Sequence, residues 1–244
     1  MIIESSANPK VKYLRSLYTK KGRRESNRFI VEGVNIVSDV PEEAKVEAIY
    51  AKPDKEELAK KLSEKFSCEV IVLKEDLFDR VCDTVNPSGL IAVVEYPKYQ
   101  IKDFSKIMIM DGISDAGNAG TIIRAAAACG FDAVFAFSSV ELFSPKCVRS
   151  TMSGIFRIPC FETTYEEFSF DGDVYLLDMN GEDIFSVYPS DRFAIVVGSE
   201  AKGPSAFFKE RANKVISIPM QNGVESLNAA VSASLAMYLF QYRR

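Results

Sequence analysis

The sequence predicts an α/β protein of two domains, the second of which contains a mainly parallel sheet. Short apolar runs typical of strands alternate with amphipathic stretches between residues 28 and 97, and this alternation starts again at residue 106. Strands separated by helices favour a parallel sheet covered on both faces. The chain of 244 residues is long enough to bury a sizeable core, and its content of 47% apolar and 26% charged residues is typical of globular proteins.

The first region begins with a predicted helix that opens at "NPKVKYL", where Asn8 is a good capping residue and Pro9 suits the first helical position. Apolar residues of this stretch fall on one helical face, and Gly22 is expected in a basic loop that follows. Beyond it we expect strands in "RFIVEG", "VEAIYAK", "EVIVLK" and "LIAVVEY", and helices in "EELAKKLSEKF" and "EDLFDRVCD". This first domain is expected over residues 1–97, followed by a linker over 98–105.

The second domain is expected over residues 106–244. Its predicted strands are "KIMIMDG", "DAVFAF", "FRIPCF", "DVYLLDM", "FAIVVG" and "KVISIP". Helices are expected in "TIIRAAAACG", in "SPKCVRSTMSG" and at the end of the chain, beginning near Glu225. Ligands of such sheets bind beyond the carboxyl ends of the strands, so the loops at 112–120, 198–204 and 219–226 could converge on one site.

Composition excludes several kinds of chemistry and location. Because the sequence contains no histidine, Ser–His and Cys–His nucleophilic pairs and histidine metal sites are excluded. Five scattered cysteines without a CxxC pair indicate reduced thiols in a reducing compartment. The apolar runs are far shorter than a membrane span, and "MIIESSANPK" lacks a signal pattern. We therefore expect a cytoplasmic protein with no membrane association.

Charge is unevenly distributed along the chain. Residues 1–30 contain eight Lys and Arg against two acidic residues, whereas the remainder contains 22 basic and 32 acidic residues. Such a basic segment indicates either a polyanion partner or a solvated surface, and charge alone does not decide between them. The candidate RNA-contacting residues are Lys10, Lys12, Arg15, Lys20, Lys21, Arg23 and Arg24.

The loop in "DGISDAGNAGTIIRAAAACG" is rich in glycine but matches no phosphate-binding fingerprint. Asn118 stands where a P-loop requires lysine, and the spacing of the glycines is not G-x-G-x-x-G. Arg124 follows in the expected helix, where it is either a surface residue or a functional one.

The other two loops each contain polar residues after a predicted apolar strand. Glu200 could bind a ribose hydroxyl, a cation or an arginine, or it could cap a helix. Ser226 and Asn228 are suitable helix caps that could also face a ligand. The small residues of the final helix allow another backbone to approach closely, either within the core or at a subunit interface.

Taken together, the segments "NAGTIIRAAAACGF", "IVVGSEAKGPS" and "IPMQNGVESLNAAVSASLAMY" resemble the three motifs of the SpoU-type, TrmH-like RNA ribose methyltransferases of the SPOUT superfamily. The segment "SPKCVRSTMSGIFRIP" resembles the region between the first two motifs, so that the resemblance covers residues 106–244. The pieces "FIVEG" and "TVNPSGLIAVV" resemble the family's ribosomal-protein-like RNA-binding extension.

The resemblance implies S-adenosylmethionine as methyl donor and a ribose 2′-hydroxyl as acceptor, without a metal. It also implies a deep trefoil knot, which is rare among folds, and a homodimer formed through the second domain. The extension resembles that of ribosomal-RNA enzymes more than the compact transfer-RNA enzymes, so large-subunit ribosomal RNA is the expected substrate and transfer RNA the alternative.

The family's functional residues carry over onto matching positions of this sequence. The implied donor-binding residues are Gly198, Ile218, Met220 and Leu227, and the implied catalytic and substrate-placing residues are Asn118, Arg124, Glu200, Ser226 and Asn228. Many members have Asp-Pro-His-Asn where this chain has "DAGN", so we expect a more flexible loop here. An arginine is normally protonated and a poor base, so we expect Arg124 to stabilise the developing alkoxide and hold a phosphate.

Two other functions remain open on the residues alone. One is a non-catalytic RNA- or ribosome-binding protein on the same fold, against which the intact set of polar motif residues argues. The other is an oxidoreductase with a nucleotide cofactor in the glycine-rich loop, against which the missing G-x-G-x-x-G argues.

Overall fold

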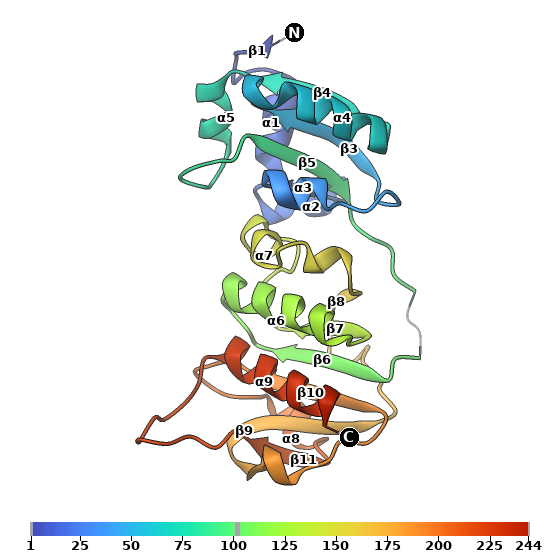
Figure 1. The fold of residues 1–244 in the computed structure, drawn as a ribbon, viewed down its shortest axis with the longest axis vertical. Coiled ribbons are helices and arrows are strands. Elements are labelled where there is room, and N and C mark those ends of the chain that lie inside the picture. The colour runs from blue at the N-terminus through green and yellow to red at the C-terminus, as the bar shows by residue number, and fades with distance from the viewer. Residues whose placement is uncertain (1, 101–102, 244) are drawn as a thin grey trace. The chain divides into compact units, whose positions relative to one another are not determined.

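The computed structural model describes residues 2–100 and 103–243, which form two compact units (Figure 1). The first unit comprises Met1–Tyr99 with Phe143–Arg149, and the second comprises Gln100–Leu142 with Ser150–Arg244. Residues 101 and 102 of the expected linker lie outside the described residues. The structure thus groups one short segment from the expected second domain with the first unit.

The first unit contains a five-stranded sheet in the order β1-β4-β3-β5-β2. Its strands are β1 (Ile2–Ile3), β2 (Arg28–Glu32), β3 (Val46–Ala51), β4 (Glu69–Leu73) and β5 (Leu90–Glu95). Strand β4 pairs in parallel with β1 and β3, whereas β5 runs antiparallel to β2 and β3. The four longer strands coincide with the four predicted apolar runs.

Helices complete the first unit and bury its core. They are α1 (Pro9–Ser16), α2 (Lys20–Ser26), α3 (Val34–Ser38), α4 (Glu56–Phe66), α5 (Glu75–Val81) and the short η1 (Pro53–Lys55). Helix α1 is capped by Asn8, as the sequence predicts, and its Val11 and Leu14 are fully buried. These side chains join Leu73, Phe78 and other apolar residues in one cluster.

The basic stretch around Gly22 is helical, so the predicted loop was wrong. Thr19 caps α2 by accepting a hydrogen bond from the Gly22 backbone N–H at 3.1 Å. A β-carbon on Gly22 would lie 2.2 Å from the carbonyl oxygen of Ser16, closer than any real contact. Glycine is needed here because α2 packs tightly against the end of α1, and a local pattern does not reveal that contact.

The segment Phe143–Arg149 packs with the first unit through aromatic and ionic contacts. The ring of Phe143 lies 5.0 Å from that of Phe29, between ring centroids. Arg149 Nη1 donates to Glu32 at 3.0 Å and to Asp83 at 2.8 Å. Glu32 is only 4% exposed, so this arginine compensates a carboxylate that would be costly to bury unpaired.

The second unit contains a six-stranded sheet in the order β11-β9-β10-β6-β7-β8, and every strand pair in it is parallel. The strands are β6 (Lys106–Asp111), β7 (Ala133–Phe137), β8 (Cys160–Thr163), β9 (Asp173–Asp183), β10 (Phe193–Gly198) and β11 (Lys214–Ser217). The central strands β6 and β10 are apolar and almost wholly buried. Their carboxyl ends lie side by side, with Asp111 paired to Gly198.

Helices and short turns flank this sheet. They are α6 (Ala116–Cys129), α8 (Ala206–Lys209), α9 (Ala229–Tyr242), η2 (Gly154–Phe156) and η3 (Ile184–Ser186). Helix α7 (Pro145–Ser150) lies almost wholly in the segment that is grouped with the first unit. Helix α9 packs against α6 and β10 through its small residues, of which Ala229, Ala230, Ala233 and Ala236 are buried. None of the helices in residues 2–100 and 103–243 has the length and apolar character needed to cross a bilayer.

Two helix starts differ from the sequence prediction. The final helix begins at Ala229 rather than near Glu225, because the Asn228 side chain accepts from the backbone N–H groups of Ala230 and Val231. Asn228 is therefore the cap, whereas Ser226 lies in the preceding loop. Helix α6 begins earlier than predicted, since Asp115 accepts from the N–H of Asn118 at 2.9 Å and closes the first turn.

Candidate active site

A cavity of about 290 Å³ opens at the carboxyl ends of the second sheet, among residues of β9, the ends of β10 and β11 with the loops that follow them, and the start of α9. All four predicted donor-binding residues line it, namely Gly198, Ile218, Met220 and Leu227. Two predicted catalytic residues, Glu200 and Ser226, line it as well. Two of the three predicted loops, 198–204 and 219–226, thus line one cavity together with residues of β9. The third predicted loop, 112–120, contributes no residue to the cavity wall.

Position 198 must be glycine because the loop that follows it folds back against the Gly198 backbone. A β-carbon at this position would lie 2.1 Å from the carbonyl carbon of Gly203 and from the nitrogen of Pro204. The loop is closed by a hydrogen bond of 2.8 Å from the Gly203 N–H to the Ser199 carbonyl oxygen. Backbone therefore forms this part of the cavity wall, where any side chain on Gly198 would be excluded.

Asp111 anchors the far end of the same loop, a role that the sequence did not reveal. Its carboxylate is 3% exposed and accepts hydrogen bonds from the Ser205 N–H at 2.6 Å and from the Tyr165 hydroxyl at 2.7 Å. Burial and this bond to Asp111 raise the pKa of Tyr165, so that the hydroxyl remains a donor at neutral pH. The loop at 199–204 is thereby fixed at both of its ends.

A chain of polar side chains links the three predicted motifs. The side-chain amide nitrogen of Asn118 donates to the carboxylate of Glu200. The side-chain amide nitrogen of Asn228 donates to the side-chain oxygen Oδ1 of Asn118 at 3.0 Å. The amide of Asn118 thus uses its donor for one motif and its acceptor for the other. Its own backbone is held by Asp115, so that the expected flexible loop is instead the first turn of α6.

Ser226 and Arg124 make no hydrogen bond or ion pair within the part of the chain that the structure describes. Ser226 lies on the cavity wall with an exposed side chain. Arg124 lies on an exposed face of α6 and does not line the cavity. Its backbone is fixed by η2, since a β-carbon on Gly154 would lie 3.1 Å from the Arg124 Cα. The backbone of Arg124 therefore lies close to η2, whereas its side chain is exposed.

The cavity wall also contains residues that sequence reasoning missed, including Asp178, Asn180 and Lys202. Asp178 and Asn180 come from β9, which continues beyond its buried portion at Leu177. The predicted strand "DVYLLDM" already placed a carboxylate directly after an apolar run. That pattern could have identified Asp178, because the carboxyl ends of parallel strands share one edge.

The basic residues of the first unit have different environments. Six predicted RNA-contacting residues are exposed, namely Lys10, Lys12, Arg15, Lys20, Lys21 and Arg24. Among these, Lys10 is paired with Glu69 and Lys21 with Glu25. Arg23 differs from the expectation, because its side chain is 3% exposed and donates to the Leu17 carbonyl oxygen at 2.7 Å. Its guanidinium stabilises the junction of α1 and α2, and we remove it from the RNA-contacting set.

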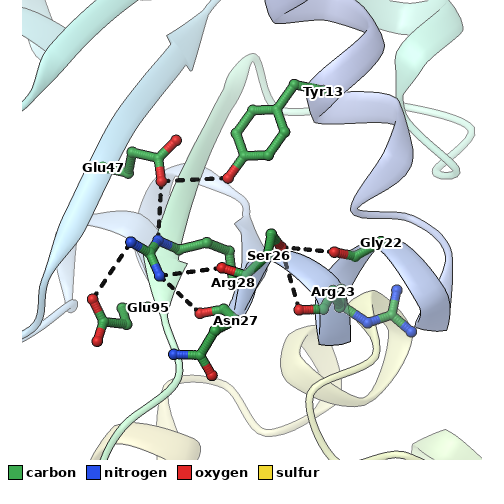
Figure 2. Close-up of polar contacts among 8 residues, drawn as sticks. All are labelled: Tyr13, Gly22, Arg23, Ser26, Asn27, Arg28, Glu47 and Glu95. Carbon is green, nitrogen blue, oxygen red and sulfur yellow. Dashed lines mark hydrogen bonds and ion pairs between the residues drawn. The ribbon is translucent and has the colours of Figure 1, made fainter.

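Nearby Arg28 is likewise committed to the protein itself. Figure 2 shows its guanidinium between Glu47 and Glu95, with Nε donating to Glu47 at 3.0 Å. The same carboxylate of Glu47 accepts from Tyr13, whose pKa rises to about 12 through burial and this neighbouring charge. The exposed lysines and arginines of α1 and α2 thus lie near Arg28, whose charge is compensated by Glu47 and Glu95.

Most of the second unit matches one known protein family in sequence. The SpoU rRNA Methylase family matches residues 105–238, which is more than half of the chain. The chain belongs to the SpoU rRNA methylase family. In this SpoU methylase, residues 8–92 match a second family, the MRM3-like substrate binding domain.

Individual relatives resemble this SpoU methylase along nearly its whole length. The 23S rRNA (guanosine(2553)-2′-O)-methyltransferase RlmP of Bacillus subtilis is 31% identical over 97% of both chains. A solved rRNA methyltransferase from Sinorhizobium meliloti is 26% identical with a TM-score of 0.87, covering 100% of this chain and 97% of that one. The SpoU methyltransferase AviRb from Streptomyces viridochromogenes, in complex with AdoMet, shares the fold at 23% identity and a TM-score of 0.83, covering 96% of this chain and 97% of that one.

The cavity of this SpoU methylase fits S-adenosylmethionine, the donor of the family. Ile216, Ile218 and Leu227 provide apolar wall for a flat ring, and the backbone beside Gly198 provides hydrogen-bonding groups. Carboxylates on the wall suit a positively charged ligand. Among residues 2–100 and 103–243 there is no cluster of three acidic or cysteine side chains with the geometry of a metal site.

Proposed function

We propose that this SpoU methylase transfers a methyl group from S-adenosylmethionine to a ribose 2′-hydroxyl of large-subunit ribosomal RNA. The observation that carries the proposal is the polar chain from Asn228 through Asn118 to Glu200 beside the cavity. It joins three separate motifs at one place and leaves Ser226 unengaged at the rim. The name of RlmP, which is a 23S rRNA 2′-O-methyltransferase, supports the choice of substrate.

The donor, when bound, supplies a methyl group on a positively charged sulfonium. The protein contributes alignment, which can account for several orders of magnitude in rate. Asn118 and Ser226 are placed to orient the acceptor ribose, since both lie where the motif loops meet. Glu200 holds Asn118 through a charge-assisted hydrogen bond, which fixes the direction of the amide.

Arg124 is assigned to the phosphate of the target nucleotide and to the developing alkoxide. Its exposed guanidinium offers several donors in a planar arrangement that suits phosphate oxygens. The exposed cations of α1 and α2 would contact further phosphates, which attract positive charge regardless of sequence. RNA binding by these residues should therefore weaken with increasing salt.

A direct test uses the purified protein, a donor labelled on its methyl group, and protein-free ribosomal RNA or transfer RNA prepared from cells that lack the protein. The proposal expects label in one 2′-O-methylated nucleoside of large-subunit RNA. Label in transfer RNA alone would replace the proposed substrate with the alternative. Donor binding without transfer to any RNA would favour a non-catalytic RNA-binding protein.

Replacing Arg124 with lysine should lower kcat about 100-fold or more, because a point charge does not reproduce the paired donors of a guanidinium. Affinity for the donor should remain unchanged, since Arg124 does not line the cavity. Single-turnover kinetics and calorimetry measure the two quantities separately. Near-full activity of the Arg124→Lys variant at neutral pH would exclude guanidinium-specific chemistry.

We also propose that the protein is a homodimer through α9 and that the second unit contains the trefoil knot. Four apolar residues of α9 are 43–68% exposed and, spaced by four, three and four positions, share one face: Val231, Leu235, Tyr238 and Tyr242. An exposed apolar stripe of this kind is typical of an interface, and a second copy is the partner that the family resemblance supports.

The dimer can be tested by light scattering coupled to size-exclusion chromatography. The wild-type protein should have twice the mass of one chain, whereas Leu235→Glu should shift it to one chain by placing a charge in the apolar stripe. Val85→Glu provides the control, since Val85 is exposed in the first unit. A wild-type protein that elutes as a single chain would contradict the dimer.

The proposed setting of this activity is the cytoplasm. Within the described parts of the chain none of the five cysteines forms a disulfide, which suits a reducing compartment. Ribosomal RNA as substrate supports the same location.

A further inference from the structure

Asp178 presents a free carboxylate oxygen at the wall of the donor cavity. Its Oδ1 accepts two hydrogen bonds from Asn180, at 3.0 Å from the backbone N–H and 3.2 Å from the side-chain amide. Its Oδ2 makes no hydrogen bond or ion pair to any of the described residues. This oxygen points toward the loop after β10, since it lies 3.9 Å from the position of a β-carbon on Gly203.

The charged side chains on this wall differ in what they already bind. They are Asp178, Glu200 and Lys202. Glu200 is engaged by Asn118 at the catalytic edge, and Lys202 is exposed on the loop. Both carboxylates accept a hydrogen bond from an asparagine amide, and neither forms an ion pair with the described residues. Asp178 is half-buried whereas Glu200 is exposed, so the charge of Asp178 is less screened by solvent.

The donor and its product differ in one charge. S-adenosylmethionine carries a methyl group on a sulfonium cation, whereas the product S-adenosylhomocysteine lacks that methyl group and has a neutral thioether in its place. Apolar wall and backbone hydrogen bonds therefore bind both ligands almost equally. A charged group on the wall distinguishes the two most strongly, because its Coulomb energy with the ligand changes when the cation is lost.

We propose that Asp178 is a specificity residue that favours the cationic donor over the neutral product, and thereby limits product inhibition. The inference rests on the proposed use of S-adenosylmethionine. At the dielectric of a half-buried site, a carboxylate on the wall of the donor cavity is expected to change the affinity for a cationic ligand by about tenfold. The carboxylate acts on binding and takes no part in orienting the ribose.

The test measures three ligands by calorimetry at low ionic strength: S-adenosylmethionine, S-adenosylhomocysteine and sinefungin, which carries a protonated amine near the sulfonium position. Asp178→Asn removes the charge and retains the Oδ1 acceptor that binds Asn180. We expect affinity for the donor and for sinefungin to fall about tenfold, with affinity for the product unchanged. Asp178→Glu, which retains the charge, should preserve the preference for cationic ligands.

Asp191→Asn serves as the matched control, because Asp191 is exposed and does not line the cavity. It should leave the affinities for all three ligands unchanged. An equal loss of affinity for donor and product in Asp178→Asn would overturn the proposal and make Asp178 a structural residue. Unchanged affinities would overturn it as well. A wild-type protein that binds none of the ligands would instead refute the proposed function itself.

Discussion

Replacing Asn118 with alanine should lower the rate of methyl transfer by about 100- to 1000-fold, as expected for the loss of a preorganised polar group at a reacting centre. Asn118 joins two motifs through its single side chain, donating to Glu200 and accepting from Asn228. Without it, Glu200 and Asn228 lose their common partner, and the acceptor ribose loses its alignment. Donor affinity should change little, since Asn118 is outside the cavity wall.

The matched control for Asn118→Ala is Thr121→Ala on the same helix. Thr121 is exposed, and its hydroxyl donates to the Gly117 carbonyl oxygen within α6. This control should retain near-wild-type kcat and KM. Thermal unfolding of both variants should remain close to that of the wild type. Full methylation by Asn118→Ala would show that the polar chain is structural and would remove it from the mechanism.

Enlarging Ala233 to leucine should destabilise the protein by about 1–3 kcal/mol, the usual cost of overpacking a filled core. Ala233 is fully buried, on the helix that packs against α6 and β10. Extra methyl groups there must push α9 away from its neighbours, because no side of this position is open to solvent. For a chain of this size the Tm should fall by about 2–10 °C, measured by calorimetry or circular dichroism.

Ala128→Leu is the control for Ala233→Leu, because it makes the same change at an exposed position of α6. An exposed helical site should tolerate the change within about 0.5 kcal/mol. If Ala233→Leu were as stable as this control, the small residues of α9 would not be needed for close packing. The sequence interpretation of that helix as a tightly packed element would then be wrong.

Much of the second unit was predictable because local patterns agree with the tertiary structure. The strands β6 and β10 are continuous apolar runs, as expected of strands buried on both faces. Their carboxyl ends must meet at one edge, which places Glu200 near the loop of Asn118. Strand order alone does not determine the hydrogen bonds between these side chains. That Asn118 connects Glu200 to Asn228 is seen only in the structure.

Other features depend on contacts between distant residues and could not be predicted. Gly22 looks like a loop glycine, yet its hydrogen atom is what lets α2 approach Ser16. Arg23 looks like its exposed neighbours, yet it is buried against Leu17. The start of α9 was misplaced because Ser226 and Asn228 are both good caps, and only the geometry selects Asn228.

The central claim is that this SpoU methylase modifies one ribose of large-subunit ribosomal RNA. Its most direct test maps 2′-O-methyl groups across total RNA from cells with and without the protein, and from cells that carry the Asn118→Ala variant. The account predicts loss of a single large-subunit site both in the absence of the protein and with the variant. An unchanged ribosomal RNA map, or loss of a transfer-RNA site alone, would contradict it.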